Sequence, residues 1–350
     1  MSEFSCPVVQ IDDVFEHPNA ERLDIARVSG FTVVVGKGEY KKGDLAIYAP
    51  PNAIIPLDIL DLMGLTGKLA GPDKNRVKPM RLRGILSEGI LIKPPFLLEE
   101  KIIGWDFSRQ LGIVKYEPPI PPHMQGELMP ASGLVIPYDV ENIKKYPDPY
   151  PDNCYVYVTE KIHGTFCQIG FNNRLIGNAD FYNGGYVASK GLGAKGFIFK
   201  NSENNKDNLY VRVARPIIDR LRNFGSNIIV LGEIYGNKVQ DLQYDLPSGK
   251  VDFRVFGAYI EVNQGVFNRL TFADTEHIAK ILCLNMVPVI AAGLWRNLKD
   301  RIYELASGQS YIATHIREGA VIHPKDLSFS PLKVVSEAYL FRGGNPTEYN

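Results

Sequence analysis

The sequence lacks an excess of charge of either sign, because 39 lysine and arginine residues balance 39 aspartate and glutamate residues. The chain as a whole therefore has no net field that attracts nucleic acid or membrane, and any such binding must come from a local patch. Long apolar runs are also missing. The longest stretch without charge, residues 281–295, is interrupted by Asn285 and Pro288 and is shorter than the roughly 20 residues that span a bilayer. The sequence predicts neither a transmembrane helix nor a membrane partner.

Cysteine is scarce, and the four cysteines (Cys6, Cys154, Cys167 and Cys283) show no paired or CxxC spacing. This spacing excludes a disulfide framework and a zinc site of the usual pattern. The opening residues, MSEFSC, contain neither a basic leader nor an apolar segment typical of a targeting signal. We therefore expect a reduced, soluble protein of the cytoplasmic or nucleoplasmic type.

The chain has 350 residues, of which 45% are apolar, and is long enough for two domains. Nine of its 24 prolines fall between residues 115 and 151. Proline fixes φ and lacks an N–H donor, so this stretch cannot form a regular helix or a central strand. The sequence predicts a proline-rich linker at 116–150, between a domain over 1–115 and a second domain over 151–350.

Residues 1–115 predict a small β-barrel. Short β-rich runs at 8–15, 23–28, 31–35, 45–48 and 89–92 are separated by glycine-containing turns. The segments HPNAERL (17–23) and VGKGEYKKGDL (35–45) resemble the opening of OB-type domains that bind RNA.

A basic run follows these strands. Five cations stand within ten residues that contain no acid: Lys74, Arg76, Lys78, Arg81 and Arg83. Locally concentrated positive charge is typical of phosphate binding, so we expect this run to contact RNA. A solvated charged loop is the alternative interpretation.

After residue 151, strands and helices mix. Strands are predicted at 155–159, 167–171, 228–234, 253–260 and 320–322, and helices at 272–284 and 297–306. The stretch 208–224 also has helical spacing, but Pro216 predicts a kink or a helix that begins there. Because the strands do not alternate strictly with helices, we expect an α+β domain with antiparallel sheets.

The most informative segment is EKIHGT (160–165), which places Lys161 at the end of an apolar strand and Gly164 in the turn that follows. A glycine there allows a ligand close to the backbone. Further charged and aromatic residues occur in or beside apolar strands downstream, in SKG (189–191), LGEIYG (231–236), FRVF (253–256), REGAV (317–321) and LKVV (332–335). The ordered set of six segments resembles the nucleotidyltransferase motifs I, Ia, III, IIIa, IV and V of covalent ligases and capping enzymes.

The resemblance extends over residues 155–336, and EKIHGT is similar to the RNA ligase form of motif I. DNA ligases and capping enzymes place an OB domain after motif V, whereas here only 17 residues follow Lys333 and the OB-like region comes first. This order resembles the ATP-dependent nick-sealing RNA ligases of the fifth RNA ligase family. The resemblance implies an α+β chain, with an N-terminal OB-type β-barrel followed by an ATP-grasp-like nucleotidyltransferase domain.

The resemblance also implies an ATP-dependent RNA ligase that joins 3′-OH and 5′-phosphate ends through a lysyl-AMP intermediate. Lys161 is then the nucleophile, and Glu233, Glu318 and Lys333 are the other catalytic residues. An amine attacks only when deprotonated, so we expect partial burial and a second cation, Lys333 or Lys190, to lower the pKa of Lys161. Glu233 is expected to hold ribose hydroxyls or the waters of a bound Mg²⁺ or Mn²⁺, and Glu318 is expected to help organise that ion, also through water.

The same resemblance assigns the contacts to ATP. Phe256 is expected to stack on adenine with Val321 below it, although each residue taken singly also fits a core position. The full set of expected nucleotide contacts is Glu160, Ile162, His163, Gly164, Lys190, Glu233, Phe256, Val321 and Lys333.

The implied partner is RNA, as a nicked duplex with a ribonucleotide at the 3′-OH end, because a 2′-OH distinguishes RNA from DNA. The protein is expected to act as a monomer. Because the six motifs lie beyond residue 151, a fragment that starts near Tyr146 is expected to keep adenylation and to lose most of its sealing activity.

Two positions depart from the family pattern. Val335 stands where many relatives have a second motif V lysine, and His163 stands where other families have an acid, which puts the metal shell in question. Two other functions stay open. A guanylyltransferase-type capping enzyme shares the lysine chemistry but normally carries a trailing OB domain. A non-catalytic RNA-binding protein on the same fold predicts loss of the nucleophile or of both acids, and all three are present.

Overall fold

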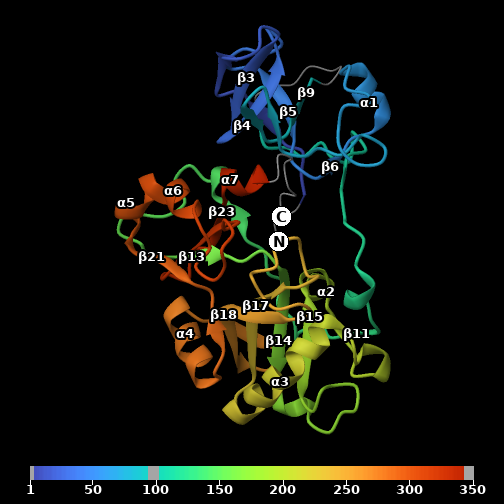
Figure 1. Ribbon diagram of the computed structural model, residues 1–350, viewed down its shortest axis with the longest axis vertical. Helices are drawn as coiled ribbons and strands as arrows, with labels where there is room; N and C mark the ends of the chain where they lie inside the picture. Colours follow the sequence, from blue (N-terminus) through green and yellow to red (C-terminus); the bar gives the residue numbers. More distant parts are fainter. Residues whose placement is uncertain (1–3, 94–101, 343–350) are drawn as a thin grey trace. The chain divides into compact units, whose positions relative to one another are not determined.

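The computed structural model describes residues 4–93 and 102–342, which divide into two compact units. The two-sheet unit consists of Pro119–Asn142 and Asp148–Ser336. The N-terminal unit consists of the described residues up to Pro118, together with Ile143–Pro147 and the described residues from Glu337 onward. The segment 116–150, predicted as a linker, thus contributes residues to both units (Figure 1).

The N-terminal unit contains two three-stranded antiparallel sheets, ordered β2-β3-β4 and β1-β5-β9. The strands are β1 (Val8–Gln10), β2 (Asp13–Glu16), β3 (Leu23–Val28), β4 (Phe31–Gly36), β5 (Leu45–Ala49) and β9 (Ile90–Ile92). Residues along β4 alternate between buried and half-buried, and buried residues of both sheets share one apolar core. The single strand predicted at 8–15 is instead two strands, which pair in different sheets.

A second apolar cluster of this unit packs α1 (Leu57–Leu62) against residues of β1, β5 and β9. Two short antiparallel pairs complete the sheet structure: β7 (Met80–Leu82) with β8 (Ile85–Ser87), and β6 (Ala53–Ile54) with β10 (Val114–Lys115). Lys144 Nζ lies 2.6 Å from Oε2 of the buried Glu88. This ion pair attaches the segment Ile143–Pro147 to the strands of the N-terminal unit.

Two larger sheets build the two-sheet unit, and their strand pairs are antiparallel except β12 with β23 and β18 with β20. The six-stranded sheet runs β15-β14-β17-β18-β19, with β20 added beside β18. The five-stranded sheet runs β12-β23-β22-β13-β21. Their bounds are β12 (Glu141–Asn142), β13 (Tyr155–Lys161), β14 (Thr165–Phe171), β15 (Gly185–Ser189), β17 (Ile228–Gly236), β18 (Val251–Asn263), β19 (Val266–Arg269), β20 (Asn285–Met286), β21 (Val289–Leu294), β22 (Gly319–Pro324) and β23 (Leu332–Val335).

The helices of this unit correct three expectations. α3 (Leu209–Phe224) is one continuous helix that contains Pro216, capped by Asn208, whose side chain accepts the N–H groups of Tyr210 and Val211. α4 (Phe272–Ile281) ends three residues before the predicted limit. The helix predicted at 297–306 is divided into α5 (Trp295–Leu298), a 3₁₀ turn and α6 (Ile302–Ala306).

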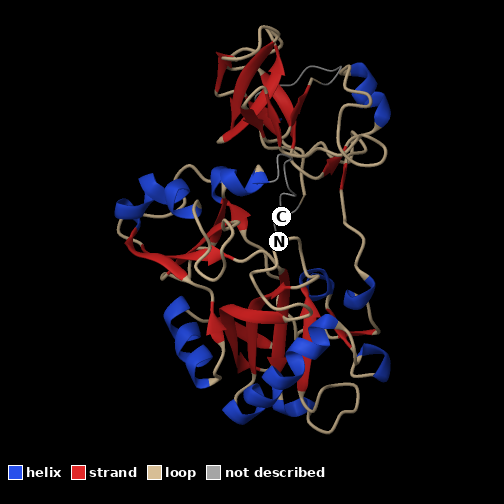
Figure 2. Cartoon of the chain, in the orientation of Figure 1, coloured by secondary structure: helices blue, strands red, loops and turns tan. Residues whose placement is uncertain are grey.

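The six-stranded sheet has two different faces. Val230 and Ile234 of β17 belong to the apolar cluster that includes α3, whereas Ile229 and Leu231 belong to a cluster that includes residues 129–138. Since side chains alternate along a strand, Glu233 lies on the face opposite α3. Figure 2 shows α3 and α4 against this sheet. Among the described residues, no helix is long and apolar enough to cross a bilayer.

Candidate active site

Lys161 is the last residue of β13, at the point where the chain passes from the five-stranded to the six-stranded sheet. Only residues 162–164 separate it from β14, which begins at Thr165. A Cβ atom at Gly164 would lie 2.2 Å from the carbonyl oxygen of Ile234, so the turn requires glycine. The short turn therefore places Lys161 at the connection between the two sheets.

Glu318 directly precedes β22, whose first residue, Gly319, pairs with Lys161 in the antiparallel register. Nζ of Lys161 lies 2.6 Å from Oε1 of Glu318. The Glu318 side chain is 1% exposed and the Lys161 side chain 19% exposed. The lysine predicted as the nucleophile thus forms an ion pair with one of the two acids predicted beside it.

His163 lies between two carboxylates. Its Nδ1 is 3.2 Å from Oε2 of Glu318, and its Nε2 is 2.6 Å from Oδ1 of Asp241. Its backbone N–H donates to the hydroxyl of Tyr244, over 2.5 Å. Burial disfavours the charged imidazole, but the hydrogen bonds to Asp241 and Glu318 outweigh burial and raise the pKa of His163. The charged ring donates from both nitrogens.

The acids and bases around Lys161 have displaced pKa values. Burial raises the pKa of Glu318, but the cation of Lys161 and the contact with His163 lower it to about 2. Burial raises the pKa of Glu233 to about 7, although Lys161 opposes the shift. Burial and the cation of Lys161 lower the pKa of Lys333 to about 7. Such opposed shifts of neighbouring acids and bases are typical of catalytic sites.

Lys190 begins α2 (Lys190–Lys195) and is exposed, with its Nζ 2.7 Å from Oδ1 of Asp139. Lys161, Lys190 and Asp139 all affect the pKa of Lys333 electrostatically. The structure therefore brings together Lys161, His163, Lys190, Glu233, Glu318 and Lys333 of the predicted set.

Glu160 and Ile162 point elsewhere. The Glu160 carboxylate is buried and accepts hydrogen bonds from Oγ of Ser310, at 2.5 Å, and from the backbone N–H of Tyr311, at 2.8 Å. Ile162 packs in an apolar cluster that includes Tyr235 and Tyr244. These two side chains, on either side of Lys161 in sequence, hold the motif in place within the protein.

Phe256 lies at a β-bulge. Leu231 pairs with Gly257 and Gly232 pairs with Val255, so Phe256 is the extra residue of β18. A bulge re-aims the side chain it contains. The ring of Phe256 stacks with Tyr138, at 5.4 Å between centroids, and Tyr138 also stacks with Phe166.

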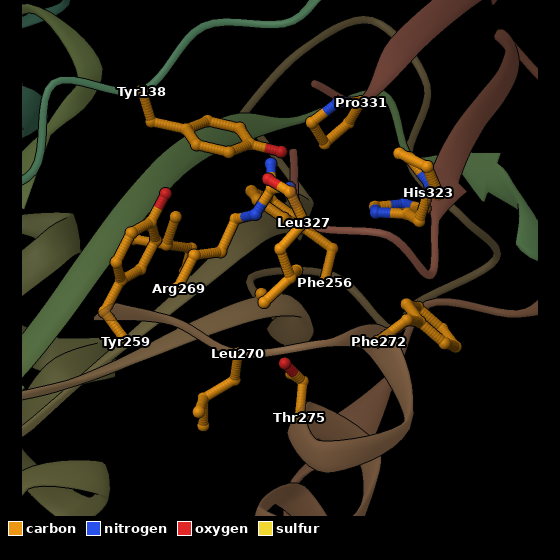
Figure 3. A pocket seen from close by; sticks show the side chains of 13 residues that line it. Tyr138, Phe256, Tyr259, Arg269, Leu270, Phe272, Thr275, His323, Leu327 and Pro331 are labelled. Carbon is orange, nitrogen blue, oxygen red and sulfur yellow. The ribbon is translucent and has the colours of Figure 1, made fainter. Parts of the chain in front are cut away.

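A pocket opens beside Phe256, between β18 of one sheet and the end of β22 in the other (Figure 3). Tyr138, Arg269 and His323 also line it. The guanidinium of Arg269 donates to the carbonyls of Leu327 and Phe329, over 3.0 and 2.7 Å. Val321 is half-buried on β22, paired with Lys333 of β23. Phe256 and Val321 thus belong to different sheets, and of the two Phe256 lines this pocket.

The five cations of the predicted RNA-binding run differ in their exposure to solvent. Lys74, Arg81 and Arg83 are exposed, and Lys78 is half-buried. Arg76 is instead buried, with its guanidinium on Oδ1 of Asn52 and 3.5 Å from the ring centre of Tyr116. A guanidinium held in the interior does not meet a phosphate at the surface, so Arg76 is corrected to a structural residue.

Four residues near the site were missed from the sequence: Tyr138, Asp139, Asp241 and Tyr244. All four lie outside the motifs, and no spacing in the sequence marks them. Their contacts with motif residues exist only because the chain returns to the site after long connections.

Among residues 4–93 and 102–342, no group of three or more His, Cys, Asp or Glu side chains is arranged to hold a metal ion. The carboxylates of Glu233 and Glu318 are hard oxygen donors, and both Glu318 oxygens already contact Lys161 and His163. These residues fit a divalent ion that keeps its waters, in the manner of Mg²⁺. They do not form a cage of protein ligands alone.

Lys161 thus lies where two mostly antiparallel sheets meet, beside the buried acid Glu318. The RNA ligase family model matches residues 155–335, and a model of an OB-fold domain matches residues 6–94. The chain therefore belongs to the RNA ligase family.

Solved structures with the same fold include Naegleria gruberi RNA ligase with PPi, which has 23% identity and a TM-score of 0.80 and covers 97% of this chain and 99% of that chain. A mutant of that ligase with AMP and Mn has 23% identity, a TM-score of 0.78, and coverage of 96% and 98%. No curated protein matches the sequence. The predicted α+β fold, the N-terminal OB domain and the assignment as an RNA ligase enzyme are confirmed.

Proposed function

We propose that this protein is an ATP-dependent RNA ligase that adenylates itself on Lys161 and seals 3′-OH and 5′-phosphate ends at nicks in duplexes, acting as a monomer. The observation that carries the proposal is the position of the Lys161 amine, 2.6 Å from Glu318 and electrostatically coupled to Lys333. A nucleophilic amine, a fixed acid and a nearby cation are the groups that lysine adenylation needs.

In the first step the Lys161 nitrogen attacks the α-phosphorus of ATP. A nitrogen–phosphorus bond forms, the bond to pyrophosphate breaks, and the nitrogen passes two of the three protons of its ammonium form to solvent and keeps one. An oxygen of the RNA 5′-phosphate then attacks the phosphorus of the lysyl-AMP, a phosphoanhydride bond forms, the nitrogen–phosphorus bond breaks, and the Lys161 nitrogen takes up protons from solvent. Finally the 3′-OH attacks that phosphate, the phosphodiester forms and AMP leaves.

Glu318 holds the attacking amine in place. Because its pKa is lowered to about 2, its carboxylate stays ionised and does not retain a proton from Lys161. Lys190 and Lys333 are the cations that face the phosphates. A phosphate beside Lys333 favours its charged form and so reverses the lowering of its pKa in the free protein.

A divalent ion, Mg²⁺ or Mn²⁺, supplies positive charge against the phosphates when it is bound. Glu233 and Glu318 would hold it through water. The solved structures of Naegleria gruberi RNA ligase mutants with ATP and Mn support this choice of nucleotide and metal class. Phe256 and Val321 would enclose adenine between the two sheets.

The function is tested by incubating the protein with ATP or GTP labelled at the α-phosphate, with Mg²⁺, and detecting label on the denatured chain. Label from ATP is expected in wild type and absent in Lys161→Arg, since a guanidinium stays protonated. Label from GTP alone would favour a capping-type guanylyltransferase. Absence of label from both nucleotides would favour a non-catalytic RNA-binding protein.

The substrate is tested on nicked duplexes with RNA or DNA at the 3′-OH strand. The exposed cations Lys74, Arg81 and Arg83 of the OB-fold domain support contact with phosphates. Sealing is expected to require a ribonucleotide at the 3′-OH end and to fall in the triple alanine variant, with labelling of Lys161 unchanged. Equal sealing of DNA ends would contradict the proposed RNA preference.

A further inference from the structure

The loop between β17 and β18 (residues 237–250) lies on the turn that follows Lys161. Three of its residues contact two consecutive positions of that turn: Asp241 and Tyr244 contact His163, and Nε2 of Gln240 donates to the carbonyl of Gly164 over 3.4 Å. Asp245 of the same loop accepts the N–H and the hydroxyl of Thr314, over 2.6 and 3.0 Å. The loop is therefore anchored both to the turn after Lys161 and to the segment that contains Thr314.

Asp241 differs from its neighbours in exposure. Its carboxylate is 59% exposed, whereas the His163 ring is 5% exposed and Glu318 is 1% exposed. The contacts run in one line: Asp241 Oδ1 to His163 Nε2 at 2.6 Å, His163 Nδ1 to Glu318 Oε2 at 3.2 Å, and Glu318 Oε1 to Lys161 Nζ at 2.6 Å. An imidazole bonded at both nitrogens has a fixed ring orientation, as seen where carboxylates orient histidines behind a reactive centre.

Other families of covalent nucleotidyltransferases carry an acid at the position of His163. In this chain a carboxylate contacts His163 from the side away from Glu318. It belongs to Asp241, which is 78 residues from His163 in sequence. The neighbouring His163 spans the distance between this carboxylate and Glu318.

We propose that Asp241 is a positioning residue for lysine adenylation: through His163 it fixes Glu318 against the Lys161 amine, so that Asp241 and His163 together replace the acid that motif I lacks. This inference rests on the proposed function, since it concerns the same lysine. Asp241 does not contact Lys161 itself in this arrangement.

The test measures single-turnover labelling of Lys161 from α-labelled ATP across a range of ATP concentrations. Asp241→Asn is expected to slow the maximal labelling rate by about tenfold while the ATP concentration for half-maximal rate changes less than about twofold. Asp241→Glu is expected to recover most of the rate. Asp219→Asn is the matched control, since Asp219 is also an exposed acid paired with a base, Arg222, and lies on α3. It is expected to behave as wild type.

A double-mutant cycle separates positioning from general damage. In the His163→Asp background, Asp241→Asn is expected to cause no further slowing, because the acid then stands in motif I itself. Multiplicative effects of the two substitutions would overturn the proposal, as would an Asp241→Asn rate equal to wild type or a His163→Asp variant without labelling. Thermal unfolding of Asp241→Asn is expected to match wild type. Failure of wild type to label with any nucleotide would instead reject the proposed function.

Discussion

Lys161 and Glu318 meet across two neighbouring antiparallel strands, with 2.6 Å between Nζ and Oε1. The register explains the contact, because Lys161 ends β13 opposite Gly319, the first residue of β22. The sequence distance between the two residues is closed entirely by sheet pairing. The contact joins motif I to motif IV and sets the position of the amine.

Glu318→Gln is expected to reduce the rate of Lys161 labelling by about 100-fold or more, because a neutral amide no longer holds the amine by charge. The fold should persist, since the amide can still meet His163. The measurement is the labelling rate together with far-UV circular dichroism. Labelling within threefold of wild type would remove Glu318 from the site's chemistry.

The lowered pKa of Lys333 predicts that ATP binding depends on pH. Burial and the cation of Lys161 lower its pKa to about 7, so Lys333 is charged below pH 7 and neutral above it in the free protein. ATP binding then requires proton uptake above pH 7, and the Kd should rise by up to about tenfold per pH unit. Calorimetry with an α,β-methylene ATP analogue between pH 6 and 9 measures this slope. Lys333→Arg, which stays charged, should flatten it. An unchanged slope in that variant would assign the dependence to another group.

The lowered pKa of His323 predicts that the free energy of unfolding depends on pH. It is 6% exposed, its Nε2 lies 3.1 Å from Oγ1 of Thr159, and burial with the nearby Arg269 lowers its pKa to about 3. Its neutral form is therefore favoured in the folded state. The resulting stabilisation is present above the ordinary histidine pKa, near 6.5, and is lost as pH falls toward 3, at roughly 1.4 kcal/mol per unit. Urea unfolding between pH 4 and 8 should show a shallower acid loss in His323→Gln. Parallel curves for both proteins would contradict this assignment.

The position of a viable truncation differs from the one expected from sequence. Residues 119–142 supply β11 (Leu128–Pro130), which pairs with β16 (Phe197–Phe199), and β12, which pairs with β23. A fragment 119–336 is therefore expected to fold and to label Lys161, whereas a fragment that starts at Tyr146 loses both strands and Tyr138. Thermal unfolding and labelling of the two fragments make the comparison. Equal stability would show that residues 119–142 are dispensable.

The sequence by itself determined those features that depend on residues close together in the chain. The strands that carry or adjoin Lys161, Glu233, Glu318 and Lys333 were predictable, because the apolar runs, the turn glycine and the charged residues in or beside the runs lie close together in the sequence. The order of these segments, and of the OB-like region before them, was sufficient to indicate the family. The kink or helix start predicted at Pro216 was wrong. The destabilisation caused by a proline within α3 is offset by packing that no local pattern reveals.

The tertiary structure alone decided which side chains meet. Asp241 reaches His163 and Tyr138 reaches Phe256 through loops without a motif, and Arg76 turns inward onto Tyr116 although Lys74, two residues earlier, is exposed. The pKa values follow the same rule, because burial and distances between charges depend on the packing of segments far apart in sequence. Local sequence fixes the type of each residue and its element, while long-range packing fixes its partner and its protonation.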